Sequence, residues 1–295
     1  ASAQDLASVT EAYNNAATLL NDGNKEAAVE AFQAVLTQAA ALGDEGAEIA
    51  NNCKGVIPDL LLSIGKGKAN EKATDAAIEF FQKAAAVAAE YGNDDVAVEA
   101  KDLIPQVLLQ AATTLLNAKD YAAAAAAYQK VIDVDPENGM AFLRMGMAYA
   151  SAGSQEDAIT ALENAAKFGQ ADNANKQLSN IFLKAAAAAQ KAKDNQGALE
   201  AAQKSVQYLD NPTAQKLIGI TALALKQNAV AAEGFEAYLA QTPQAQDKVQ
   251  ITYQLATALL GAGQNDKACG YFKQIADDAQ FGEAAKYQIT VLKCN

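Results

Sequence analysis

Small and apolar residues recur at helical spacing along almost the whole chain. In residues 119–139, KDYAAAAAAYQKVIDVDPENG, six consecutive alanines lie between Tyr121 and Tyr128, and Pro136 follows soon after. Alanine has the highest helix propensity, and proline ends a helix because it has no N–H to donate and its ring clashes with a preceding carbonyl. β-Branched residues are sparse, and the 5 prolines fall at apparent helix boundaries. This pattern predicts an all-α chain with little or no strand.

The order of small and large residues repeats along the chain. Ala124 is followed by an aromatic residue at Tyr128 and a small or branched residue at Val131, and 34 residues later the same positions hold Ala158, Leu162 and Ala165. Further copies contain a small residue and an aromatic one four positions later: Ala28 and Phe32, Ala77 and Phe81, Ala231 and Phe235, and Ala268 and Phe272. Seven copies cover nearly the whole chain, and VIPDLLL matches LIPQVLL at a spacing of 47 residues. Repeats of this length predict stacked helical hairpins.

These positions resemble the tetratricopeptide repeat, a family in which small residues lie where two antiparallel helices cross and large ones where neighbouring hairpins stack. The resemblance is most specific at 105–172, and the first two copies depart from it by spacings of 49 and 47 residues. It implies an all-α superhelix, a right-handed solenoid of about seven helical hairpins. The expected divisions of this single solenoid are two long degenerate hairpins at 1–104, two closely matching repeats at 105–172, three further repeats at 173–280 and a capping helix at 281–295.

Short polar segments separate the expected helices. Turns within pairs are predicted at NDGN (21–24), NAKD (117–120), SAGS (151–154), AKDN (192–195) and GAGQND (261–266). FGQADNANKQLSN at 168–180 is the widest interruption; it is either a hinge or a longer connection with a helical cap, and we favour the connection. FGEAAKYQITVLK at 281–293 predicts one more helix, which would cap the apolar face of the last hairpin.

The chain is strongly acidic. It has 35 acidic and 23 basic residues, a formal net charge of −12, and Arg144 is its only arginine. Such a surface repels phosphate backbones and anionic lipid headgroups, so we expect neither nucleic acid nor a membrane surface as a partner. No apolar run approaches the roughly 20 residues that cross a bilayer, so no membrane insertion is expected.

Residues that commonly carry catalysis or bind metals are scarce. The chain has no histidine, so it lacks the commonest general base and metal ligand, and Ser–His or Cys–His pairs are impossible. The carboxylates at 94–95 and 277–278 are adjacent in sequence, and such pairs point apart on a helix or lie in turns. We therefore expect no enzyme activity, no catalytic or metal site and no cofactor.

The three cysteines allow one sharper hypothesis. We place Cys269 at the start of the second helix of the last hairpin and Cys294 at the end of the capping helix. They are then 12 and 13 residues from Phe281, near the expected turn, so antiparallel helices would bring the two side chains side by side. They then form either a disulfide, which requires an exported protein, or two reduced buried thiols. The remaining Cys53 is expected to be a small apolar residue in a helix interface.

The first residues, ASAQDLAS, resemble the small-residue stretch left around a signal cleavage site. We therefore expect an exported protein of the bacterial periplasm or cell envelope. A cytoplasmic protein is the alternative.

The resemblance also implies a binding surface, because tetratricopeptide arrays present residues of their first helices on a concave face. The matching positions in this chain are Leu62, Leu109, Thr113, Leu143, Met147, Leu183, Ile220 and Tyr253. Arg144, next to Leu143, lies either at the groove edge or simply on the surface. Such a groove would bind an amphipathic helix or an extended peptide, whereas in the alternative these residues pack within the solenoid or are covered by the N-terminal helix.

The resulting functional prediction is a protein-interaction scaffold that binds a protein or peptide. One alternative is a structural spacer or self-associating assembly subunit whose grooves are filled by the chain itself or by another copy. A second is the capture of a small molecule in an enclosed apolar pocket.

Overall fold

The computed structural model describes residues 5–295 and divides into two compact units, one ending at Ala148 and the other beginning at Tyr149. The division falls inside helix α7 (Gly139–Ala152), and each unit is described by itself. Residues 1–4, part of the stretch on which export is predicted, lie outside the described residues. All regular structure in the described part of the chain is helical, so the prediction of an all-α fold is confirmed.

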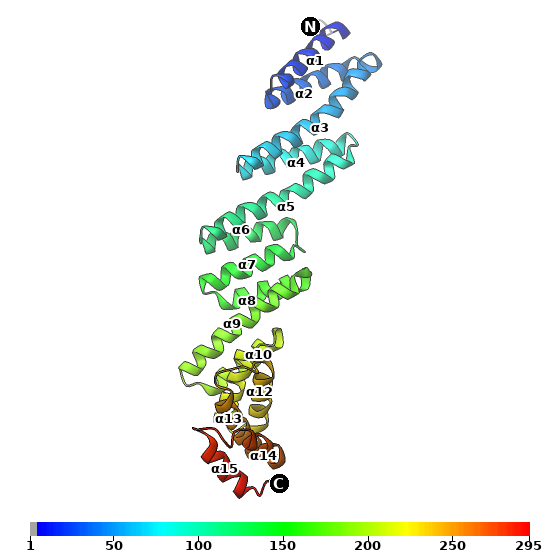
Figure 1. Cartoon of the computed structure of the whole chain (residues 1–295). Helices are drawn as coiled ribbons and strands as arrows, with labels where there is room; N and C mark the ends of the chain where they lie inside the picture. The colour runs from blue at the N-terminus through cyan, green and yellow to red at the C-terminus, as the bar shows by residue number, and fades with distance from the viewer. Residues whose placement is uncertain (1–4) are drawn as a thin grey trace. The chain divides into compact units, whose positions relative to one another are not determined.

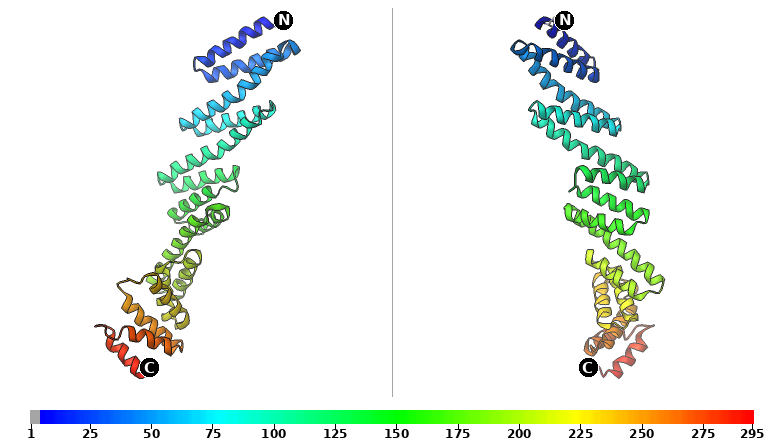
Figure 2. Two further views of the ribbon diagram at one scale, coloured as in Figure 1. Left: turned by 45° about the vertical axis from the view of Figure 1, so that its right-hand side comes forward. Right: turned by 180° about the vertical axis from the view of Figure 1, so that it is seen from behind.

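Successive antiparallel helices build the first unit (Figure 1). From α1 to α6 each helix packs against the next one along the chain, and both views in Figure 2 show these helices side by side. They are α1 (Leu6–Asn21), α2 (Lys25–Ala41), the 3-10 helix η1 (Gly43–Gly46), α3 (Ala47–Asn70), α4 (Thr74–Glu90), α5 (Asp94–Asn117) and α6 (Tyr121–Val134). Their apolar core extends from Val9 in α1 to Val107 in α5.

The second unit contains the end of α7 and eight further α-helices. They are α8 (Gln155–Ala165), α9 (Ala171–Lys191), α10 (Asn195–Tyr208), α11 (Pro212–Ala224), α12 (Asn228–Gln241), α13 (Lys248–Gly261), α14 (Asn265–Gln274) and α15 (Gly282–Val291). A core that extends from Ala186 to Ala285 holds α9 to α15 together. In chain order the α-helices of the described residues make seven pairs followed by α15, which is the predicted series of hairpins with a final helix.

The five predicted polar turns all lie between the two helices of a pair. In each of the seven pairs one residue of this turn has a positive φ: Gly23, Lys72, Lys119, Gly153, Lys193, Lys226 and Gly263. This conformation lets backbone N–H groups reach back to the last carbonyls of the first helix, as in the 3.0 Å bond from the N–H of Asp120 to the carbonyl of Leu115. The turns therefore cap the first helix and reverse the chain in two or three residues.

Small residues lie where the two helices of a pair cross, as the repeat predicts. A Cβ added to Gly65 would lie 2.6 Å from the ring of Phe81, and one added to Gly219 would lie 2.5 Å from the ring of Phe235. Only glycine fits at so close an approach. The alanine and aromatic positions of the repeat are thus explained by packing.

Two prolines depart from the predicted pattern. Pro58 and Pro105 lie inside the 24-residue helices α3 and α5, so the expectation that all five prolines mark helix boundaries is wrong for these two. The other three follow it, since Pro136 and Pro243 come after α6 and α12 and Pro212 begins α11. Long flanking segments with good helix formers and buried apolar faces keep α3 and α5 continuous although each proline removes one hydrogen bond.

The expected boundaries between groups of repeats, at 104/105 and 172/173, lie inside helices α5 and α9. Both helices begin before these boundaries. The expected wide connection at 168–180 is mostly helix. Helical geometry is broken at Phe168 and at Gly169, which has a φ of 89°, and α9 already begins at Ala171.

The last helix is joined to the preceding hairpin by a disulfide. Cys269 of α14 is bonded to Cys294 just after α15, with the Cα atoms 5.7 Å apart, which is the pairing that the spacing from Phe281 suggested. Cys53 in α3 is fully buried, and burial raises the pKa of its thiol to about 11. A neutral, inaccessible thiol is unreactive, so Cys53 has a packing role.

Candidate functional site

The predicted concave-face residues differ in their exposure. Leu62 and Leu143 are each only 6% exposed and belong to the protein interior. Leu183 and Ile220 are half-buried against the core of the second unit. For these four residues the structure resembles the alternative in which they pack within the solenoid.

The polar and aromatic members of the set are held by neighbours within their own unit. The guanidinium of Arg144 donates a 2.6 Å hydrogen bond to the hydroxyl of Thr113, which in turn lies 3.1 Å from the hydroxyl of the buried Tyr128. The ring of Tyr253 packs against the rings of Phe272 and Phe281, with centroids 5.8 and 5.5 Å away. These contacts connect helices, so they do not by themselves indicate a ligand.

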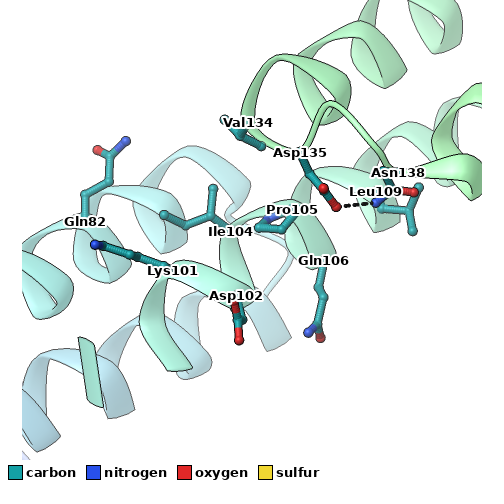
Figure 3. A pocket seen from close by; sticks show the side chains of 10 residues that line it. All are labelled: Gln82, Lys101, Asp102, Ile104, Pro105, Gln106, Leu109, Val134, Asp135 and Asn138. Carbon is teal, nitrogen blue, oxygen red and sulfur yellow. Dashed lines mark hydrogen bonds between the residues drawn. The ribbon is translucent and has the colours of Figure 1, made fainter. Parts of the chain in front are cut away.

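Leu109 and Met147 are the half-buried apolar members of the set in the first unit, and Leu109 lines a pocket. This pocket, with a volume of about 670 Å³, lies on α5 where α6 ends (Figure 3). It is lined by Gln82 of α4, by Lys101, Asp102, Ile104, Pro105, Gln106 and Leu109 of α5, and by Val134, Asp135 and Asn138 at the end of α6 and beyond it.

The end of α6 shapes the pocket. Pro136 cannot donate a backbone hydrogen bond and disfavours helical geometry in the residue before it, so α6 ends at Val134 and Asp135 takes a non-helical φ of −140°. The chain then turns to α7, where the side chain of Asn138 accepts a 2.9 Å hydrogen bond from the N–H of Ala141. The amide of Asn138 also donates to Asp135 at 3.0 Å, which fixes this wall of the pocket (Figure 3).

The pocket has an apolar floor and a polar rim. Ile104 and Pro105 form the floor between Lys101 and the end of α6 (Figure 3), and Val134 is 53% exposed beside them. Because Pro105 has no N–H, the carbonyl of Lys101 lacks its usual helical partner four residues later. Apolar contact surrounded by a few polar groups is the usual composition of a binding site.

A second hollow of about 520 Å³ continues along α5 from the first one. It is lined by Asp95, Val98, Glu99, Asp102, Leu103 and Gln106, two of which also line the larger pocket. The N-terminal half of α5 is therefore recessed and acidic over several turns. Within residues 5–295, no group of three or more cysteine, aspartate or glutamate side chains is arranged to hold a metal ion, and no helix is long and apolar enough to cross a membrane.

Sequence reasoning found only Leu109 among the ten lining residues. Several of the other nine lie in LIPQVLL (103–109) or in the stretch 119–139, but the repeat gave none of them a binding role, and they come together because α5 is long and α6 is short. The one sequence feature that could have indicated the pocket was Pro136, because it ends α6 early. In the repeat pattern Pro136 is explained as an ordinary helix end.

Two family models, each described as tetratricopeptide repeat, match residues 105–138 and 140–168. No curated protein matches the sequence. Among solved structures, MamA is 21% identical, with a TM-score of 0.35 and coverage of 62% of this chain and 94% of its own. YrrB, described as a TPR protein with an unusual peptide-binding site, is 18% identical, with a TM-score of 0.34 and coverage of 61% and 91%. The TPR domain of P58(IPK) is 14% identical, with a TM-score of 0.30 and coverage of 97% of both chains. TM-scores below 0.5 place no constraint on the pocket or on its ligand.

Proposed function

Because the chain is a tetratricopeptide repeat protein, we propose that it is a non-enzymatic interaction scaffold that binds a peptide or helical segment of another protein against α5. The observation that carries this proposal is the pocket at the end of α6, which offers apolar side chains on a rigid helical framework. Binding would use this preformed surface and would involve no covalent chemistry.

The size and chemistry of the pocket suit a protein segment. A volume of about 670 Å³ accepts two or three side chains, and Ile104, Leu109 and Val134 supply apolar contact for them. The polar rim, including Lys101 and Gln106, can pair with the backbone or side chains of the segment. A net charge of −12 disfavours nucleic acid and anionic lipid, which leaves protein as the class of partner best matched to this surface.

The proposal is tested by capture from a native extract with two matched variants. Val134→Glu places a charge at the pocket edge, and Lys130→Glu places the same charge on an exposed position of α6 outside the pocket. We expect the first variant to bind the captured protein roughly tenfold more weakly and the second to bind it as the unmodified chain does, with equal helicity by circular dichroism. Equal capture by all three chains would overturn the proposal.

We further propose that the protein works in an oxidising compartment such as the bacterial periplasm. The supporting observation is the disulfide between Cys269 and Cys294, because such bonds persist in exported proteins and are rare in the cytosol. Thiol counting on protein trapped with an alkylating agent in intact cells tests this. One free thiol per chain is expected, and three free thiols would contradict the proposed location.

A further inference from the structure

The first unit contains two copies of one hairpin. Residues 47–92 align with residues 94–139 without a gap, and the first helices of the two copies, α3 and α5, both have 24 residues. Lys72 and Lys119, 47 residues apart, hold the same left-handed turn with φ values of 61° and 62°. The copies are therefore close enough in structure for their differences to be informative.

The second helices of the copies end at different places. α4 continues to Glu90, whereas α6 ends at Val134, because Pro136 stands where α4 has Ala89. The alignment therefore places Val134 and Asn138 of the second copy opposite Val87 and Tyr91 of the first.

The longer α4 covers its partner helix. Tyr91 packs against the core of the unit, and the ammonium of Lys54 lies 5.8 Å from the centre of its ring. Burial is also the main reason why the pKa of Tyr91 is raised. Ile57 is fully buried and Pro58 is buried as well.

The same surface is open in the second copy. Ile104 and Pro105 match Ile57 and Pro58, yet both are only half-buried and line the pocket. Asn138 does not cover them as Tyr91 covers α3, because its side chain is engaged in capping α7. Val134 keeps the place of Val87, so the side chain that the second copy lacks over α5 is the aromatic ring of Tyr91.

The open copy is also more acidic. Acidic residues of α5 replace uncharged residues of α3 at three matching positions, Asp94 for Ala47, Glu99 for Asn52 and Asp102 for Gly55, while one exchange is the reverse, Gln106 for Asp59. Glu99 is paired with Lys66, whereas Asp102 lines both hollows. A ligand that continues along this face would therefore gain from lysine or arginine side chains.

We propose that the pocket binds a helical segment of a partner protein that carries an aromatic residue followed by basic residues. The aromatic ring would occupy the place that Tyr91 takes in the other copy, beside Lys101 as Tyr91 lies beside Lys54. A second copy of this chain is a poorer ligand, because its own α4 end is already packed. This inference rests on the proposed binding of a protein segment at α5 and specifies its chemistry.

The protein itself supplies the probe. A synthetic peptide with the sequence of residues 82–92, QKAAAVAAEYG, followed by two lysines, carries a fluorophore at its N-terminus. A lactam between a lysine introduced at position 86 and Glu90 keeps it helical, since both positions are exposed in α4. We expect saturable binding by fluorescence anisotropy, weakened about tenfold by Tyr91→Ala in the peptide.

Protein variants then locate the bound peptide. Val134→Glu should weaken binding about tenfold and Lys101→Ala about threefold, whereas Lys130→Ala, on an exposed face of α6, should leave it unchanged. The inference is overturned if the peptide does not bind, or if Tyr91→Ala in the peptide leaves its affinity unchanged. If the peptide experiment fails but capture from extract still depends on Val134, the proposed scaffold function stands and only the proposed ligand chemistry is wrong. If both experiments fail, both proposals are wrong.

Discussion

Lysine occupies the left-handed position of four turns between paired helices, where glycine is the residue under least strain. A side chain at positive φ costs roughly 1 kcal/mol because its Cβ approaches the backbone. Three other turns of the same kind have glycine at that position. The lysines thus store small amounts of strain that do not help the helices to pack.

Replacing one of these lysines by glycine should therefore stabilise the chain. We expect Lys119→Gly, between α5 and α6, to raise the free energy of unfolding of the first unit by roughly 0.5–1 kcal/mol. Lys130→Gly, inside α6, is the matched control and should lower it by about 1 kcal/mol, because glycine is unfavourable in a helix interior. Urea titrations followed by circular dichroism measure both, and a loss of stability in Lys119→Gly would contradict the account of the turns.

Individual side chains also show where the repeat pattern stops being informative. Leu62 and Leu109 occupy matching positions in two similar motifs, VIPDLLL and LIPQVLL, yet Leu62 is 6% exposed and Leu109 lines the pocket. Both leucines follow the same Ile-Pro pair at the same spacing, so the surrounding elements decide the exposure. No periodicity of the chain itself could separate the two leucines.

At the scale of helices, a charged contact joins three of them in the second unit. The ammonium of Lys216 in α11 donates to the carboxylate of Asp247 at the start of α13, and the hydroxyl of Tyr238 in α12 donates to it at 2.6 Å. Burial would raise the pKa of Asp247, but hydrogen bonds from Lys216 and Tyr238 outweigh it and lower the pKa below its usual value. The ionised carboxylate therefore contributes to the stability of this unit.

The sign of the pH effect follows from the lowered pKa. An acid with a depressed folded-state pKa contributes stability above its unfolded pKa, near 4, and loses that contribution as the pH falls through the folded value. We expect Asp247→Asn to lower the free energy of unfolding by about 1–2 kcal/mol at pH 7, with the difference shrinking below pH 4. Glu233→Gln, exposed on α12, is the control. Denaturant titrations between pH 2.5 and 7 test this, and a difference independent of pH would contradict it.

The helices themselves were largely predictable. The repeated small and aromatic residues, the polar turns and the helix at 281–293 all gave elements that the structure contains. Pro58 and Pro105 were misread because tertiary packing keeps α3 and α5 continuous across them. The pocket escaped prediction because it depends on the lengths of α5 and α6 together, which no single motif records.

At the scale of the whole molecule, the chain consists of two units with separate apolar cores. The proposed binding pocket belongs to the first unit and the disulfide to the second. Changes in one unit should therefore be distinguishable from changes in the other.

Reduction of the disulfide provides such a test. The bond closes a sequence separation of 25 residues, so its loss should cost the second unit about 3 kcal/mol by restoring entropy to its unfolded state. Hydrogen–deuterium exchange should become faster in α14 and α15 and stay the same in α1 to α6. The variant Cys294→Ser should reproduce the reduced protein, and unchanged exchange in α14 and α15 would show that the bond does not hold the final helix.

Binding of a partner protein at the α5 pocket is tested by site-specific photo-cross-linking in a native extract. A photoreactive phenylalanine derivative replaces either Gln106 at the exposed rim of the pocket or Lys130 on α6 outside it. We predict that the derivative at position 106 yields a cross-link to another protein and that the derivative at position 130 does not. Unlabelled chain should reduce the cross-link from Gln106 by competing for the partner, whereas the Val134→Glu variant should compete poorly. The same cross-links from both positions, none from Gln106, or cross-links only to other copies of this chain would contradict the account of the pocket as a binding site for a partner protein.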